Sequence, residues 1–391
     1  MSGRVEELDA GTKVGDAAGG NTEQNGKAVV DGHVPLRVIE KGRSTHFLDK
    51  FFNNEQRESR VSGCWCDTRI STHSGHTSSS SHEAPYLCFL GSGIKMQVWE
   101  AAAAILGFMV LNLKAVVLLG LDLFRLVVPP EEKSLAGELV LVTGAGQNLG
   151  RELAVQLSRL GAKLILLDIN EKQNYATAEL VRNEGGEAQA YYCDVSDQED
   201  VAAVAAKIRR EVGHPRYVFN NAGTYEHKPF LNHSPADIMR MVSVNLLGSL
   251  WVAREFLGHM VKHNNGHLVC ISSVLGYIGR QNVVPYCASK FGVKGMTEAL
   301  AEEMRMERRS GVRVTAVHPF LISNISDVNP NLKFPWLFEV LSTSDAAARI
   351  IRGVRRNQEE IFLPEKLKPF MVFSKVLPRK LRRLFGDYME S

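Results

Sequence analysis

Seven apolar segments alternate with helix-like segments from residue 138 onward, and this alternation restricts the fold more than any other feature of the chain. The segments read ELVLVTG, AKLILLDI, AQAYYCDV, RYVFNNAG, GHLVCISS, VRVTAVHP and EEIFLP. Strands that are apolar throughout and separated by helices are covered on both faces of their sheet. The sequence therefore predicts an α/β fold with a doubly wound parallel sheet of about seven strands and helices on both faces.

A glycine-rich turn, TGAGQNLG, joins the first of these strands to a helix that we expect to begin near Leu149. In a parallel sheet this place brings backbone N–H groups and a helix N-terminus to the position of a pyrophosphate. The turn therefore predicts a Rossmann-type dinucleotide site. We expect cofactor contacts there at Thr143, Gly144, Gly146, Gln147, Asn148, Leu149 and Gly150.

Asp168 ends the second predicted strand, 18 residues beyond Gly150. At this range a carboxylate accepts hydrogen bonds from an adenosine ribose diol, and it would repel a 2′-phosphate. No Arg or Lys follows it directly, and Gln147 in the turn is neutral. We therefore expect NAD rather than NADP, with a solvated acid at a strand end as the alternative for Asp168.

The segment YCASK places Tyr286 and Lys290 four residues apart on one face of a predicted helix. An ammonium beside a phenol favours the phenolate, so we expect a lowered pKa for Tyr286 and a role as general base. Ser273 ends the fifth predicted strand, and its hydroxyl could hold a substrate oxygen. Surface solvation of the Tyr–Lys pair is the alternative.

TGAGQNLG, CDV, NNAG, Asn245 in VSVNLLG, Ser273 and YCASK together resemble the short-chain dehydrogenases/reductases, from about residue 136 to the end. An apolar N-terminal segment followed by KSLAGE, GHLVCISS and YCASKFGV is similar to the membrane-associated retinol and 17-beta-hydroxysteroid dehydrogenase branch, particularly the epidermal retinol dehydrogenases. The resemblance implies an oxidoreductase and a homodimer, with a catalytic domain over residues 136–365.

The resemblance also implies a role for each matching residue. Tyr286 would exchange the proton, Ser273 would polarise the alcohol or carbonyl, Lys290 would bind the nicotinamide ribose, and Asn245 would hold a proton-relay water. Asp194 would approach the adenine. Further cofactor contacts would come from Val195, Asn221, Ala222 and Gly223.

Two positions depart from the family pattern. Asn148 stands where the T-G-x-x-x-G-x-G turn has its middle glycine, and HPFLISN replaces P-G-x-V-x-T, with Phe320 and Asn324 at the glycine and threonine positions. Asn is one of the few residues with a Cβ that is enriched at positive φ. We therefore expect a working but strained turn at Asn148, and altered nicotinamide contacts near Asn324.

Residues 1–95 are rich in Gly, Ser, Thr, Asn and charge, and we expect a disordered, dispensable tail. Relatives in the branch begin close to the apolar segment, where Met96 stands. Cys64 and Cys66 with nearby histidines fit no standard zinc spacing, so we expect no metal site. The six cysteines have no disulfide spacing, and three of them lie in predicted core segments, which favours a cytosol-facing domain.

Residues 96–130 form an apolar segment long enough to cross a bilayer. Lys114 lies near its middle, and at 100° per residue Glu100, Lys114, Asp122 and Arg125 share one side. This pattern favours a helix in the membrane interface, or a hairpin, over a straight span. A buried core helix of a soluble protein is the further alternative.

Two segments near the C-terminus bear on the substrate and the membrane. The family places its substrate lid after the sixth strand, where Phe334, Trp336, Leu337 and Phe338 would make it apolar or would simply pack as a short helix. Residues 366–391 mix Lys and Arg with apolar side chains, which suits an anionic membrane surface or a solvated basic helix. A net charge of +3 predicts no nucleic-acid partner.

The sequence therefore predicts an NAD-dependent oxidoreductase of a lipophilic alcohol, retinol first and a 17-hydroxysteroid second. It would lie on the endoplasmic reticulum membrane or a lipid droplet, with its catalytic domain in the cytosol. The alternative is a dehydrogenase-like membrane or lipid-droplet protein that has lost catalysis.

Overall fold

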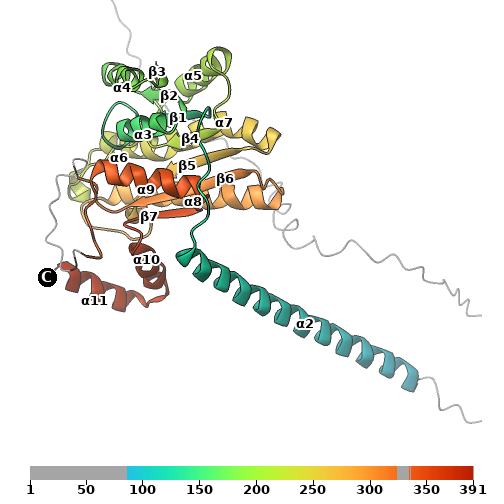
Figure 1. Ribbon diagram of the computed structural model, residues 1–391. Coiled ribbons are helices and arrows are strands. Elements are labelled where there is room, and N and C mark those ends of the chain that lie inside the picture. The colour runs from blue at the N-terminus through green and yellow to red at the C-terminus, as the bar shows by residue number, and fades with distance from the viewer. Residues whose placement is uncertain (1–85, 324–333, 335, 391) are drawn as a thin grey trace, which may run out of the picture. The chain divides into compact units, whose positions relative to one another are not determined.

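The computed structural model describes residues 86–323, 334 and 336–390. In this part of the chain a seven-stranded parallel sheet has the order β3-β2-β1-β4-β5-β6-β7 (Figure 1). Its strands are β1 (Leu139–Thr143), β2 (Lys163–Asp168), β3 (Glu187–Tyr192), β4 (Tyr217–Asn220), β5 (Gly266–Ile271), β6 (Val312–Pro319) and β7 (Glu360–Leu363). All seven predicted strands are confirmed, and so is the doubly wound fold.

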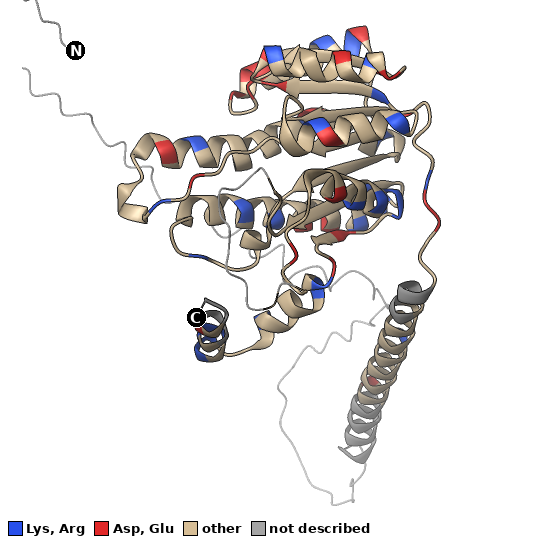
Figure 2. Ribbon diagram, turned by 60° about the vertical axis from the view of Figure 1, so that its left-hand side comes forward, with Lys and Arg blue, Asp and Glu red and all other residues tan. Residues whose placement is uncertain are grey.

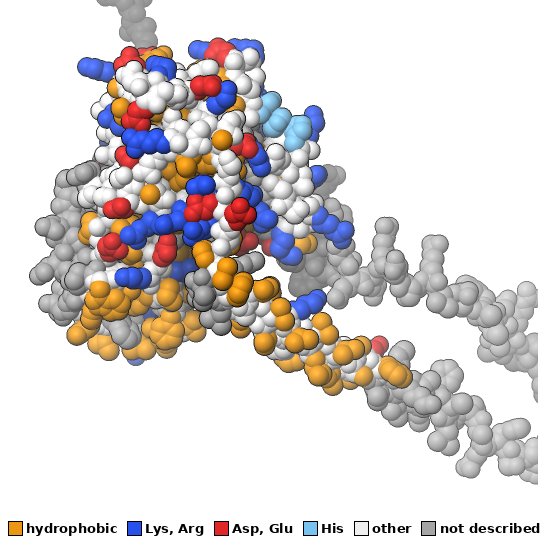
Figure 3. Space-filling model, viewed as in Figure 1, with side chains coloured by type: hydrophobic (Ala, Val, Ile, Leu, Met, Phe, Trp, Pro, Cys, Tyr) orange, Lys and Arg blue, Asp and Glu red, His pale blue; other side chains and the backbone are white. Residues whose placement is uncertain are grey.

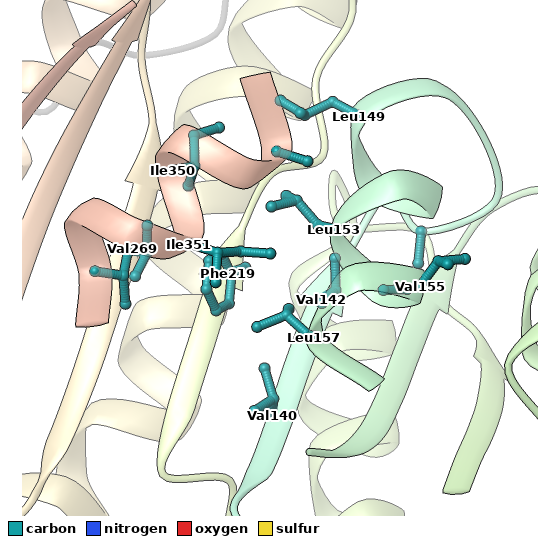
Figure 4. Packing of buried hydrophobic residues seen from close by; sticks show 14 of the residues in the cluster. Val140, Val142, Leu149, Leu153, Val155, Leu157, Phe219, Val269, Ile350 and Ile351 are labelled. Atoms are coloured by element: carbon teal, nitrogen blue, oxygen red, sulfur yellow. The ribbon is translucent and has the colours of Figure 1, made fainter. Parts of the chain in front are cut away.

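Helices cover both faces of this sheet because each strand sends alternate side chains to opposite sides. In β1, Val140 and Val142 join one apolar cluster, whereas Leu141 joins the other. The first cluster packs against α3 (Asn148–Arg159), α4 (Glu171–Asn183) and α9 (Thr343–Arg355), as Figure 4 shows for α3 and α9. The second packs against α5 (Gln198–Glu211), α7 (Gly248–His263) and α8 (Val284–Met306).

The buried cysteines agree with this core. Cys193, Cys270 and Cys287 are buried, free thiols, as predicted for three of the six. Cys64 and Cys66 lie outside the described residues, and so do residues 1–85 of the predicted disordered tail. Residues 86–95 of that tail are helical, so the prediction of disorder is wrong there.

The apolar N-terminal segment is one continuous helix, α2 (Tyr86–Val127). It begins ten residues before position 96, because the apolar run YLCFL extends the helix backwards. The predicted hairpin is therefore wrong, since Gly107 and Gly120 are accommodated without a break. The buried-core alternative is wrong as well: the stretch Trp99–Leu121 is long and apolar enough to cross a membrane, and 0% of it is buried. Figure 2 shows few charges on its described part.

The C-terminal segment also forms helices, α10 (Leu367–Val376) and α11 (Arg379–Glu390). Leu367 and Met371 of α10 are fully buried in a third apolar cluster with Val274, Phe338 and Phe362. The first half of the expected basic tail is therefore packed against the domain. A short α6 (Pro235–Val242), a π-helical turn (Ser243–Leu247) and two 3₁₀ turns (Phe230–Asn232 and Val274–Gly276) complete the described elements.

Candidate active site

The site begins where β1 and β4 separate at the carboxyl edge of the sheet, which is the point where doubly wound sheets bind ligands. The Thr143 hydroxyl accepts hydrogen bonds from the backbone N–H groups of Asn221 and Ala222, both at 2.9 Å. In return, the Asn221 amide donates to the carbonyls of Thr143 and Gly144, at 2.9 and 3.3 Å. The predicted contacts after β1 and β4 are thus parts of one hydrogen-bonded unit.

The turn requires glycines because other backbone atoms approach these positions too closely for a side chain. Gly144 has φ +65, and a Cβ there would lie 2.9 Å from the Ala222 Cα. A Cβ on Gly150 would lie 1.9 Å from the Gly144 carbonyl oxygen. The turn therefore presents bare backbone beside the N-terminus of α3, an arrangement that suits a phosphate.

Asn148 is the first residue of α3 and has φ +47, which confirms the expected left-handed conformation. Its side chain and that of Gln147 are exposed, whereas the Leu149 side chain is buried in the core. Leu149 can therefore reach a cofactor through its backbone and not through its side chain.

Asp168 lies at the end of β2 and faces the turn. Its carboxylate accepts from the Gly146 N–H at 2.8 Å and from the Asn170 N–H at 2.8 Å. Arg151, which the sequence analysis did not single out, donates to the Gly146 carbonyl at 2.5 Å. Its spacing from the turn, one residue past Gly150, was a signal that could have found it.

The loop that follows β3 is held by hydrogen bonds between its own residues. The Asp194 carboxylate accepts from the backbone N–H and the hydroxyl of Ser196, at 2.9 and 2.7 Å. Val195 is buried, and its carbonyl would lie 2.9 Å from a Cβ on Gly248. Asp194 is thus fixed by its own loop just beyond the carboxyl end of β3.

Ser273, Tyr286 and Lys290 come together across β5 and α8. Ser273 is buried, and its hydroxyl accepts from the Leu275 N–H at 3.1 Å and contacts the Pro319 carbonyl at 3.4 Å. The Lys290 ammonium donates to the Ile271 carbonyl at 2.8 Å and lies 5.7 Å from the centre of the Tyr286 ring. The structure therefore groups the three predicted catalytic residues.

The expected lowering of the Tyr286 pKa is wrong in this structure. Burial raises the pKa of Tyr286 to about 12, although a hydrogen bond from Ser273 acts in the opposite direction. Burial also lowers the pKa of Lys290 to about 8. Desolvation thus outweighs the attraction between ammonium and phenolate on which the sequence prediction rested.

Asn245 is fully buried in the π-helical turn. Its side-chain oxygen accepts from the Thr224 N–H at 2.7 Å, and its amide donates to the Thr224 carbonyl and the Ser289 hydroxyl, at 2.9 and 3.0 Å. A Cβ on Gly223 would lie 3.2 Å from the Asn245 oxygen and 3.5 Å from the Lys290 nitrogen. Both hydrogens of the Asn245 side-chain amide are therefore engaged. A relay water would have to donate to a remaining lone pair of an Asn245 oxygen.

The lid segment is described in part, and Asn324 lies outside the described residues. Phe320 donates its N–H to the Leu363 carbonyl at 2.8 Å, and its ring lies 5.4 Å from that of Phe338. Phe338 is buried, whereas Trp336 is 66% exposed. Figure 3 shows hydrophobic side chains gathered on the surface at the lower part of the molecule in that view.

Among the described residues, Glu226, His233 and Asp237 are close enough to hold a metal ion. The Lys228 ammonium already lies 2.7 Å from Glu226 and 2.8 Å from Asp237. The Arg240 guanidinium lies 3.1 Å from Glu226. The two carboxylates are therefore paired with two cationic side chains of the protein, and we propose no metal there.

A glycine turn at the topological switch point, with a buried Ser–Tyr–Lys group two strands away, defines a dinucleotide-dependent oxidoreductase. Residues 138–332 match the short chain dehydrogenase family. The chain belongs to this family, and it is an enzyme of the oxidoreductase class that interconverts an alcohol and a carbonyl with a nicotinamide dinucleotide.

Two curated relatives show the range of similarity. Epidermal retinol dehydrogenase 2 of Mus musculus is 40% identical over 270 residues, covering 68% of this chain and 86% of the relative. The 17-beta-hydroxysteroid dehydrogenase 13 of Homo sapiens is 32% identical over 259 residues, covering 66% of this chain and 85% of the relative.

Solved structures share the fold. A short chain dehydrogenase/reductase from Burkholderia phymatum in complex with NAD is 23% identical with a TM-score of 0.56, over 62% of this chain and 94% of that chain. A metagenomic short-chain oxidoreductase in complex with NADP is 27% identical with a TM-score of 0.50, over 59% of this chain and 97% of that chain.

The backbone angle at Asn148 predicts how substitutions there change cofactor affinity. Asn148→Gly relieves the strain and should leave the Kd for NADH within about threefold, whereas the β-branched Asn148→Val should raise it about tenfold or more. Titration of NADH fluorescence in the three proteins measures this. Equal affinity for the valine variant would show that the residue is not constrained at positive φ during binding.

The raised pKa of Tyr286 predicts a pH dependence that differs between the two directions of the reaction. Oxidation needs the phenolate, which is scarce below a pKa of about 12, so kcat/KM for the alcohol should rise with pH. Reduction needs the phenol and should stay level. Both should be measured from pH 6 to 7, below the Lys290 pKa of about 8, so that most Lys290 side chains stay protonated. A level profile for oxidation would mean that the working enzyme holds Tyr286 at a pKa below 6.

Proposed function

We propose that this enzyme uses NAD to interconvert a membrane-dissolved alcohol and its carbonyl, with retinol as the first candidate and a 17-hydroxysteroid as the second. The observation that carries the proposal is the grouping of Ser273, Tyr286 and Lys290 beside Gly223 at the strand edges. The names of the relatives, a retinol dehydrogenase and 17-beta-hydroxysteroid dehydrogenases, support the two substrate classes.

In this reaction Tyr286 takes the hydroxyl proton of the alcohol and returns it to the oxygen in the reverse direction. Ser273 donates its hydroxyl hydrogen to the substrate oxygen. Lys290 binds the ribose of the cofactor and stabilises the phenolate of Tyr286 by its charge. The bound nicotinamide supplies the acceptor for the hydride of the carbinol carbon.

The choice of NAD rests on Asp168. Its carboxylate lies at the turn, 2.8 Å from the Gly146 nitrogen, and would repel a 2′-phosphate there. Arg151 could favour NADP, but its guanidinium is engaged by the Gly146 carbonyl at 2.5 Å and the Thr177 hydroxyl at 3.1 Å. The negative charge therefore decides the preference.

Replacing this charge tests the cofactor preference. The wild type should have a higher kcat/KM with NAD than with NADP, and Asp168→Asn, which keeps an acceptor for the Gly146 N–H, should reduce the ratio about tenfold. Asp194→Asn is the matched control and should leave the ratio unchanged. A wild type that prefers NADP would assign the 2′-phosphate to Arg151.

A lipophilic substrate is supported by the apolar cluster beside the catalytic group. Phe320, Phe334 and Leu337 pack against the buried Val274 and Phe338, next to the loop that carries Ser273. Ligand sites are commonly apolar with a few placed polar groups, and these residues with Ser273 and Tyr286 have that composition.

A turnover assay with NADH and retinal or estrone tests the function. Tyr286→Phe should lower kcat by about 10²-fold or more while NADH binding is retained, because the proton donor is lost and the fold is not. Tyr217→Phe, a buried tyrosine at the opposite strand ends, is the matched control. A wild type that binds NADH and converts neither substrate would favour the catalytically lapsed membrane protein.

Membrane attachment through α2 completes the proposal. Its side chains are exposed over Trp99–Leu121, and most of them are apolar. The exposed apolar side chains of α10 and α11, with the basic residues beside them, would add contact with an anionic surface; the apolar ones include Val372, Phe373, Val376, Leu381 and Leu384. We propose the endoplasmic reticulum or a lipid droplet, a cytosolic catalytic domain, and a homodimer.

Deletions separate the contributions to membrane binding. Removing residues 1–95 leaves the stretch Trp99–Leu121 intact and should change neither activity nor sedimentation with membranes. Removing residues 1–128 should release much of the protein on alkaline carbonate extraction. If the longer deletion still sediments, the C-terminal helices are sufficient and α2 is not the anchor.

A further inference from the structure

His318 lies at the end of β6, fully buried, directly behind the serine of the catalytic group. Its ring nitrogen Nδ1 lies 3.4 Å from the Ser273 carbonyl oxygen, and Nε2 lies 3.7 Å from the Glu360 Oε1 on β7. Both ring nitrogens thus face an oxygen atom, although Nε2 makes no hydrogen bond and its approach to the Glu360 carboxylate is a contact of 3.7 Å. The ring therefore links a carboxylate of one strand to the backbone of Ser273.

The same carboxylate also holds the far end of the serine loop. Ser273 caps the 3₁₀ turn Val274–Gly276, and Tyr277 follows that turn. The Tyr277 hydroxyl donates to Glu360 Oε1, and its ring stands edge-on to His318 at 4.8 Å. His318 and Glu360 thus hold the loop at both of its ends, residues 273 and 277.

Glu360 carries the negative charge at this place. Contacts with His318 and Tyr277 hold the pKa of Glu360 at about 2, so the carboxylate is ionised at neutral pH. The ammonium groups of Lys294 and Lys375 lie 4.6 and 5.3 Å from the centre of the Tyr277 ring. Glu360 is therefore the anion that accepts from Tyr277 and faces His318, while the two lysines contact the Tyr277 ring.

The position of the Ser273 hydroxyl depends on this loop. The Ser273 carbonyl accepts from the Gly276 N–H at 2.8 Å in addition to His318, and its hydroxyl reaches the carbonyl of Pro319, the residue after His318. A shift of about 1 Å in a catalytic group can cost about 10²-fold in rate. The Leu275 N–H of the same loop also donates to this hydroxyl at 3.1 Å, so a displaced loop would displace the hydroxyl.

We propose that His318 and Glu360 form a clamp that positions Ser273 for the reaction. This rests on the function proposed above, because it assigns the pair to catalysis through Ser273. Both are positioning residues, since the contacts that they make are with Ser273 and Tyr277 and not with reacting atoms.

Two substitutions of His318 test its contact with Ser273 separately from its contact with Glu360. Asparagine places an amide near the position of Nδ1, so His318→Asn keeps a donor for the Ser273 carbonyl. Glutamine reaches the position of Nε2, so His318→Gln keeps a partner for Glu360 and loses Ser273. His267→Gln is the matched control, because His267 is also buried between β5 and β6 but bonds Thr315 at 2.8 Å near the opposite strand ends.

The clamp predicts a specific pattern in the NADH-dependent reduction of retinal or estrone. His318→Gln and Glu360→Gln should lower kcat about tenfold or more, with KM and the Kd for NADH within about threefold. His318→Asn, which keeps the Ser273 contact and loses Glu360, should lower kcat less than His318→Gln, and the double variant His318→Gln/Glu360→Gln should lose no more than the worse single variant. Wild-type kcat in His318→Gln and Glu360→Gln would overturn the proposal.

Hydrogen–deuterium exchange supplies a readout that does not need turnover. Peptides spanning residues 272–280 should exchange faster in His318→Gln and Glu360→Gln than in the wild type or His267→Gln. Unchanged exchange in both clamp variants would overturn the proposal whatever the rates are. A wild type that turns over no carbonyl would refute the proposed function, and the exchange comparison would still decide whether the pair holds the loop.

Discussion

The hydrogen bonds of Thr143 and Gly144 with Asn221 and Ala222 are the interaction on which the rest of the site depends. They join the ends of β1 and β4 where the strand order reverses, and they do so through four contacts of 2.9 to 3.3 Å. Each such bond contributes about 0.5–1.5 kcal/mol net, but an unsatisfied buried partner costs more than that. These bonds therefore hold the phosphate turn and the loop that begins at Gly223 in one fixed relation.

The strands that follow β4 in the sheet place the catalytic residues relative to this junction. β5 pairs with β4 and places Ser273, and α8 returns across β5 so that Lys290 reaches the Ile271 carbonyl at 2.8 Å. β6 and β7 then support Ser273 from behind through His318 and Glu360. The cofactor turn and the catalytic group thus occupy one edge of the sheet because all strands run in the same direction.

Much of this could be predicted from the sequence because the decisive patterns are local. Mostly apolar strands alternating with helical segments predicted the parallel sheet, and the tolerance of asparagine for positive φ predicted the angle at Asn148, which is +47. The spacing of Tyr286 and Lys290 predicted a shared helix face. What failed depended on contacts between distant segments: burial reversed the pKa shift expected for Tyr286, and the role of His318 emerges only when β7 and the serine loop meet it.

The central claim is that Tyr286 and Ser273 direct a hydride between a nicotinamide and a lipophilic carbonyl. The most direct test is a single-turnover reaction of the full-length protein with NADH deuterated on C4 and either retinal or estrone. The account predicts that mass spectrometry finds one deuterium on the carbinol carbon of the product, and that Tyr286→Phe forms no such product. Tight binding of the deuterated NADH without any transfer to either carbonyl would contradict it.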